Sequence, residues 1–193
     1  YTEENPISFN PFYTDDYVFD VEKKDSIKTL LLTLWKTEDD KITKTESGEL
    51  GSAVSAYIER IRSDRSIIPS LNTFYEYMRD DYRREMEERE IRVRREDFDI
   101  DNLLVTLRQY YRGGRYDFLL NSTENIDLLS KRFIVFEIDS IKENRELFPV
   151  VTIIIMEAFI NKMRRLKGVR KQLIIEEAWK ALSSANMAEY LRY

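Results

Sequence analysis

Two short apolar runs on either side of a long amphipathic stretch constrain the fold of this chain more than any other feature. The first run, "RFIVFEID" (132–139), is rich in β-branched and aromatic residues and predicts a strand buried on both faces, as in a parallel sheet. The second, "KQLIIEE" (171–177), predicts another buried strand. Between them, residues 146–168 predict a helix with Pro149 in its first turn and Gly168 at its end. Strand, helix and strand in this order predict a right-handed, parallel βαβ unit.

A helical block precedes this unit. Asp25 or Ser26 is expected to cap its first helix, and the polar stretch 36–49 is expected to be a loop. A later helix is expected to start near Ser70, and the last to stop at Gly113–Gly114. Apolar residues at helical spacing mark four faces: Ile27, Leu30, Leu31 and Leu34; Leu50, Val54, Tyr57, Ile58 and Ile61; Leu71, Phe74, Tyr75, Met78, Tyr82 and Met86; and Ile100, Leu103, Leu104, Leu107 and Tyr111.

These patterns predict an α/β fold in three parts. Residues 1–20 hold two Asn-Pro steps and many aromatics, which predicts a loop packed on the domain. Residues 21–114 are expected to form a helical insertion subdomain, and residues 115–193 an α/β core segment. Because the chain starts at Tyr1 rather than at Met and ends abruptly, we expect it to be a piece of a larger protein.

Two residue types are absent from the sequence, and their absence limits the catalytic mechanisms and metal sites that the chain could use. The 193 residues include no His and no Cys. A Ser–His–Asp triad, a Cys nucleophile and a His- or Cys-ligated zinc site are therefore excluded within this chain, as are disulfides. Catalysis would have to use carboxylates, Lys, Arg, Tyr or an oxygen-liganded metal such as magnesium. The net charge of −5 does not suggest a general nucleic-acid or membrane-surface binder.

Adjacent carboxylates, Glu176 and Glu177, follow the second predicted strand. Ligands bind at the carboxyl ends of parallel strands, and neighbouring strand residues point to opposite faces. In P-loop nucleotide hydrolases one acid at this place holds magnesium and a second polarises the attacking water. On this reading Glu176 is the magnesium ligand and Glu177 the catalytic residue. Alternatively, the strand simply ends here and the acids favour the N-terminal dipole of a helix over 178–183.

Other charged residues leave alternatives open. Asp139 closes the first predicted strand, where it caps the following segment or joins Glu176 at a metal. The second option would suit a carboxylate–magnesium hydrolase of phosphodiesters, although such a site needs more acids. A third possibility is a helical protein-interaction module with a small α/β base and no catalysis. The basic cluster of residues 164–171 is expected to complement a helix C-terminus rather than to contact DNA.

Several segments, in order along the chain, resemble the conjugative type IV secretion ATPases of the TraG/TrbE/CagE group, above all the TraG branch of conjugative transposons. Besides "RFIVFEID" and the long helix after it, they are "ISFNPF" (7–12), "PSLNTFYEYM" (69–78), "GGRYDFLL" (113–120) and "QLIIEEAWKAL" (172–182). The last carries the apolar strand, the acids and the "EAW" that precede a helix in that group. The resemblance spans nearly the whole chain.

The resemblance implies a RecA-like P-loop ATPase that forms hexamers at the cytoplasmic face of the inner membrane. It would use ATP and magnesium to power transfer of DNA or protein, together with other proteins of the conjugation apparatus. Carried over to this sequence, it assigns magnesium to Glu176, water activation to Glu177, and a bracing role for the next helix to Trp179. It points to no direct nucleic-acid site.

One part of the family pattern is missing. The Walker A motif, G-x-x-x-x-G-K-[ST], grips the phosphates, and none of the five glycines begins one. We therefore expect the phosphate loop to precede Tyr1, and the fragment alone to bind nucleotide poorly and hydrolyse none. In the family a strand leads into the phosphate loop, and we expect this strand to be missing as well. Its absence should leave a sheet edge or an apolar helix face uncovered, which a second copy of the chain covers.

Overall fold

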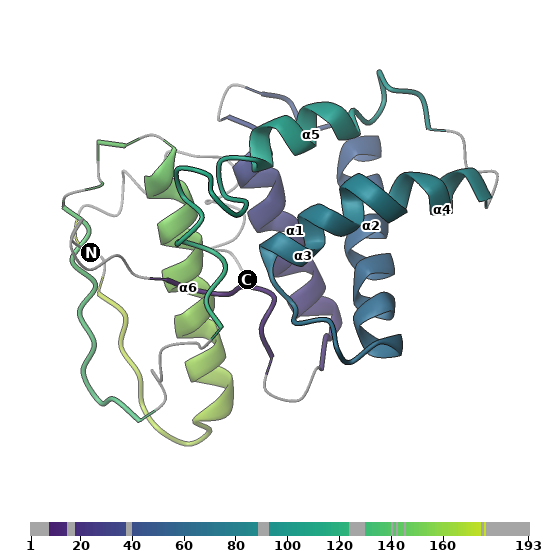
Figure 1. Ribbon diagram of the computed structural model, residues 1–193. Helices are drawn as coiled ribbons and strands as arrows, with labels where there is room; N and C mark the ends of the chain where they lie inside the picture. The colour runs from purple at the N-terminus through teal and green to yellow at the C-terminus, as the bar shows by residue number, and fades with distance from the viewer. Residues whose placement is uncertain are drawn as a thin grey trace. The chain divides into compact units, whose positions relative to one another are not determined.

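The computed structural model covers residues 1–193, and helices form all the regular structure in the part that it describes (Figure 1). The described residues are 8–14, 18–37, 40–88, 93–123, 130–139, 141, 143–144, 146–174 and 176. The chain divides into two compact units. The first, the helical unit, comprises Ile7–Asn125, and the second comprises Tyr1–Pro6 with Ile126–Tyr193.

Helix α1 (Val21–Trp35) packs along helix α2 (Lys44–Ser63) in the helical unit (Figure 1). The predicted face of α1 is confirmed, because its apolar residues are all buried. Its N-cap differs from the prediction: Asp20, rather than Asp25 or Ser26, accepts a hydrogen bond from the Lys23 N–H (2.7 Å). The helix therefore starts earlier than the apolar spacing alone suggested.

Helix α2 also starts earlier than predicted, inside the stretch 36–49 that was expected to be a loop. Thr43 and Glu46 form a capping box: the Thr43 hydroxyl accepts from the Glu46 N–H (3.1 Å), and the Glu46 carboxylate accepts from the Thr43 N–H (2.8 Å). Each side chain satisfies a backbone donor that the first turn leaves without a helical partner. The predicted face from Leu50 to Ile61 is confirmed as buried.

An ion pair joins the end of α1 to the start of α2. Lys36 Nζ lies 2.6 Å from the Glu46 carboxylate and 4.1 Å from the centre of the Trp35 ring. Burial by itself raises the pKa of Glu46, but hydrogen bonds from Lys36 and Thr43 outweigh it and hold the pKa below its usual 4.5. The charged carboxylate thus stabilises the folded state.

Replacing Glu46 with Gln is expected to destabilise the helical unit by about 1 kcal/mol at neutral pH. A lowered folded-state pKa means that the stabilisation is present above the unfolded-state pKa and is lost as the pH falls through the folded-state value. The difference from wild type should therefore shrink below pH 4.5. Urea denaturation at a series of pH values measures it. Glu59→Gln is the control, because its 2.6 Å pair with Arg62 is exposed, and an equal pH dependence there would contradict the prediction.

The next helix is continuous through three parts: α3 (Leu71–Tyr77), the π-helical turn η1 (Met78–Tyr82) and α4 (Arg83–Glu88). Ser70 is its N-cap, as predicted, and accepts from the Thr73 N–H (3.2 Å). The predicted apolar stripe is confirmed as buried. It stays on one side of the helix even though the π-helical turn adds a residue to the repeat.

Helix α5 (Ile100–Leu107) packs against α1 and ends before the predicted glycine pair. Trp35 connects the two helices: its Nε1 donates to Asn102 Oδ1 (2.6 Å), and its ring meets Phe98 edge-on at 5.6 Å. A chain of turns then leads to Gly113, whose φ of +77° is a left-handed conformation that glycine adopts without strain. The prediction that the glycine pair stops the helix is wrong, because α5 ends at Leu107 and turns continue on both sides of Gly113–Gly114.

The expected packing of the N-terminal aromatics is confirmed for Phe9, Phe12 and Phe19, which are buried. Phe12 stacks on Phe74 (5.6 Å between ring centres) and meets Tyr57 edge-on (5.7 Å). Asn10 is 1% exposed, and its amide nitrogen donates to the carbonyls of Pro69 (2.8 Å) and Ser122 (3.0 Å). The segment is therefore part of the core of the helical unit.

The second unit contains helix α6 (Leu147–Arg165), which confirms the long predicted helix. Pro149 lies in its first turn, and Gly168 follows its end with a φ of +76°. The N-terminal half is buried on more than one side, since Val150, Thr152 and Ile153 are all buried. None of the described helices is long and apolar enough to cross a membrane.

The predicted α/β fold class with a parallel βαβ unit is wrong for the described residues. Residues 132–139 and 171–174 form no strand, and Figure 1 draws both as irregular chain. Phe133 is 86% exposed and Ile174 75% exposed, where burial on both faces was expected. An apolar, β-branched run becomes a strand only when a neighbouring strand completes its backbone hydrogen bonds. The residue composition of a segment does not specify which other segment will pair with it as a neighbouring strand.

Candidate functional site

Glu176, the predicted magnesium ligand, lies in a turn and is exposed. It follows the irregular segment 171–174 rather than the carboxyl end of a strand, so the geometric argument that led to it does not hold here. Glu177, the predicted catalytic residue, and Trp179 lie outside the described residues. Their assigned roles remain predictions.

Asp139, the other candidate ligand, is also exposed. Its backbone N–H donates to the Glu137 carboxylate (3.1 Å), and a turn follows in which the Ile141 N–H donates to the Ile138 carbonyl (3.0 Å). The described residues contain no group of three or more acidic side chains placed to hold a metal ion. The carboxylate–magnesium hydrolase of phosphodiesters therefore lacks the ligand cluster it would need there.

The basic cluster of residues 164–171 was expected to complement a helix C-terminus, and one contact at the end of α6 supports this expectation. Lys171 Nζ donates to the carbonyl of Leu166, which is the C-cap of α6. A cation beside the free carbonyls at a helix C-terminus is stabilising, because it complements the negative end of the helix dipole. The described contact is therefore that of a helix cap.

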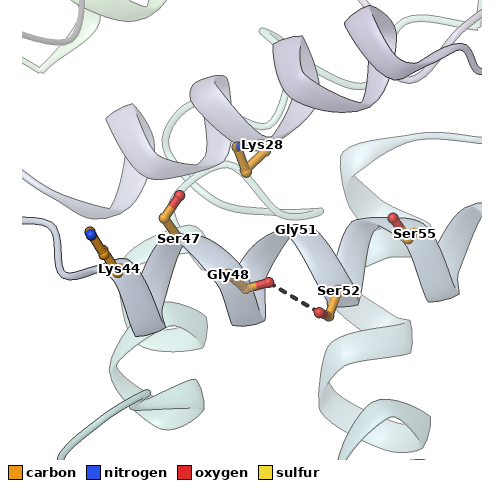
Figure 2. Close-up of a pocket in the computed structure, with 7 residues that line it drawn as sticks. All are labelled: Lys28, Lys44, Ser47, Gly48, Gly51, Ser52 and Ser55. Carbon is orange, nitrogen blue, oxygen red and sulfur yellow. Dashed lines mark hydrogen bonds between the residues drawn. The ribbon is translucent and has the colours of Figure 1, made fainter.

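A groove between α1 and α2, called here the α1–α2 groove, has a volume of about 550 Å³. Figure 2 shows its lining: Lys28 from α1, and Lys44, Ser47, Gly48, Gly51, Ser52 and Ser55 from α2. No prediction from the sequence included this groove. The available signal was the run of small residues at four-residue spacing on α2, such as Ser47, Gly51 and Ser55, which lie on one face of a helix.

The groove has the chemistry of a contact surface rather than of a catalytic site. Lys28 Nζ is 2.9 Å from the Asp25 carboxylate, and the Ser52 hydroxyl donates to the Gly48 carbonyl (3.1 Å). The lining holds hydroxyls and two cations but no carboxylate that could act as a base or as a metal ligand. Its glycines are helical, unlike those of a phosphate-binding loop.

Comparison with protein families shows which family the chain belongs to. The family model described as the TraG P-loop domain matches residues 1–193. The chain belongs to this family. No curated protein and no solved structure shows a significant match.

Membership in the TraG P-loop family confirms the resemblance drawn from the ordered motifs. The chain is a TraG-type conjugation P-loop protein, a class of domain whose general property is nucleotide binding. The match runs through the helical unit as well as through the segment that carries Glu176 and Glu177. Both units are thus part of the family's domain.

Proposed function

We propose that this chain is part of a motor ATPase of a conjugation or type IV secretion system. Such a motor hydrolyses ATP to power the transfer of DNA or protein. The observation that carries the proposal is the match of the TraG P-loop model to all 193 residues. The exclusion of His and Cys chemistry agrees with it, since nucleotide hydrolysis by P-loop proteins relies on carboxylates, backbone groups and magnesium.

In this proposal Glu176 holds magnesium, directly or through a water molecule, and Glu177 activates the attacking water. Adjacent acids can divide these tasks because one neutralises phosphate charge through the metal while the other accepts a proton. ATP and magnesium are the proposed cofactors.

The same assignment implies an assembly. As in the family resemblance, we propose a homo-oligomer, a hexamer, at the cytoplasmic face of the inner membrane, where it meets other proteins of the conjugation apparatus. A ring suits a P-loop motor because residues from a neighbouring subunit can stabilise charge on the transferred phosphate.

Magnesium-dependent ATP hydrolysis tests the proposal. The 193 residues alone should show none, because they contain no Gly-Lys-Ser/Thr phosphate loop. In a longer polypeptide that joins them to such a loop, Glu177→Gln should lower turnover at least about a hundredfold while nucleotide binding persists. Glu176→Gln should weaken the dependence on magnesium. Glu59→Gln, on the exposed side of α2, is the matched control.

Two results would count against the proposal. One is full turnover by the Glu177→Gln variant, and the other is magnesium-dependent turnover by the 193 residues alone. A second candidate, a helical protein-interaction module without catalysis, is favoured by the exposure of Glu176 in a turn and by the helical character of the described residues. Absence of ATP binding in the longer polypeptide would select this candidate.

A further inference from the structure

Helix α4 has little apolar packing of its own. Met86 is the one buried residue among its six, whereas four of the seven residues of α3 are buried. Figure 1 draws α4 as the continuation of α3 past α2. A helix of six residues is unstable in water by itself. The helical state of α4 therefore depends on the turn that joins it to α3 and on its contacts with neighbouring helices.

The joining turn, η1, is a weak point in this continuous helix. Its backbone hydrogen bonds span five residues instead of four, and sharp bends in helices occur at such turns. Beyond the turn, the Tyr77 hydroxyl donates to Glu85 (2.8 Å), and Arg83 lies 2.7 Å from Asp101 of α5. Arg83 and Asp101 are both exposed by half or more, and exposed ion pairs contribute little stability.

One carboxylate connects α4, η1 and α2. Asp81, in η1, has one oxygen 2.8 Å from the guanidinium of Arg60 on α2, and its other oxygen accepts from Arg84 on α4. These three residues are called here the Asp81 latch. The Asp81 side chain is only 16% exposed, so its charged hydrogen bonds are less screened than those on the surface. The neighbouring Asp80 is 53% exposed and pairs with Arg79 inside the same turn (2.6 Å).

We propose that α4 is a separately opening segment, which unwinds back to η1, and that the Asp81 latch sets how often it opens. In the closed state the latch joins α4 and η1 to α2. In the open state Arg84 returns to solvent and Met86 loses its burial, while α3 keeps its own buried face. The cost of opening is small because α4 buries a single apolar side chain.

The latch makes the state of α4 respond to charge. An anionic group that pairs with Arg60 or Arg84 competes with Asp81 and shifts the segment toward its open state. Salt does the same by screening, since the contacts that close the segment are mainly ionic. The device does not depend on the proposed ATPase function, because every group in it belongs to the helical unit.

Backbone amide hydrogen exchange of the 193-residue chain tests the proposal. At low salt, Asp81→Asn should accelerate exchange of the α4 amides at least about fivefold, and exchange of the α3 amides should stay unchanged. Asp80→Asn is the matched control, because it removes a carboxylate from the same turn without touching α2, and it should leave α4 near wild type. Equal acceleration by the two variants, or equal acceleration of α3 and α4, would overturn the proposal.

Salt and a second substitution identify the ionic contact itself. At about 1 M salt, where charges are screened beyond about 3 Å, wild-type exchange of α4 should approach that of Asp81→Asn to within about twofold. Asp81→Asn should also accelerate exchange less in an Arg60→Gln background than in wild type, because one partner is already gone. Salt-independent exchange of α4 in the wild type, or strictly additive effects of the two substitutions, would refute the latch.

Discussion

Replacing Phe74 with alanine is expected to lower the free energy of unfolding of the helical unit by about 3–5 kcal/mol. The Phe74 side chain is fully buried at 0% exposure. Its ring stacks on Phe12 at 5.6 Å and meets Tyr57 edge-on at 5.3 Å. Truncation would remove the buried apolar area and leave a cavity between two aromatic rings held by different parts of the chain.

Urea denaturation measures this loss, and a tryptophan can report it. Trp35 is 6% exposed in the helical unit, so a Trp179→Phe background leaves its fluorescence as the only tryptophan signal. Val105→Ala is the control, because Val105 is 73% exposed on α5, and its effect should stay within about 0.5 kcal/mol. Comparable effects of the two substitutions would mean that the aromatic cluster is not the centre of the core.

The same substitution extends to a test of the N-terminal segment. A double-mutant cycle of Phe12→Ala and Phe74→Ala should give a coupling of about 0.5–1.5 kcal/mol, the size expected for an aromatic pair in contact. Strictly additive effects would show that Phe12 does not pack on α3 in solution.

Replacing Asn10 with alanine is expected to destabilise the helical unit by about 3 kcal/mol, although the substitution removes little apolar area. The amide nitrogen donates to the carbonyls of Pro69 and Ser122, and the amide oxygen accepts from the Phe12 N–H (3.0 Å). Without the side chain these three backbone groups lose the partner that Asn10 provides; Asn10 is 1% exposed, Pro69 and Phe12 are buried, and Ser122 is half-buried. Each loss costs about 1 kcal/mol or more.

Thermal or urea denaturation measures the effect of Asn10→Ala, and two further variants make it specific. Ser52→Ala removes a single exposed hydrogen bond on α2 and should cost less than about 0.5 kcal/mol. Asn10→Asp sets a buried carboxylate against two carbonyls, which raises its folded-state pKa. That variant should therefore be more stable in mild acid than at neutral pH, and its stability should fall as the pH rises. A neutral effect of Asn10→Ala would show that water replaces the amide.

The helices could be predicted because their signals are local. The buried faces of α1, α2 and the helix from Leu71 to Glu88 follow from spacing alone. The start of α2 was missed, although Thr43 and Glu46 form the Thr-x-x-Glu pattern of a capping box, because the glycines and polar residues that follow favour a loop. Packing of α2 on α1 outweighs this weak preference.

The candidate site was less predictable than the helices. Glu176 and Glu177 were selected by their place at the end of a strand, and the described chain forms none there. The family itself was predicted correctly, because the order of short motifs along the chain does not depend on how they pair in space. Motif order therefore identified the protein class, whereas the site geometry inferred from a strand did not hold.

By itself the sequence determined the helical faces, the exclusion of His and Cys chemistry, and the family. Helix hydrogen bonds join residues that are four apart in the chain, so the sequence pattern that specifies a helix lies within the helix itself. Only the tertiary structure decided that Asn10 bridges Pro69 and Ser122, that a groove lies between α1 and α2, and that Phe133 and Val135 lie exposed. Each of these depends on partners far away in the chain, and no local pattern specifies where such partners lie.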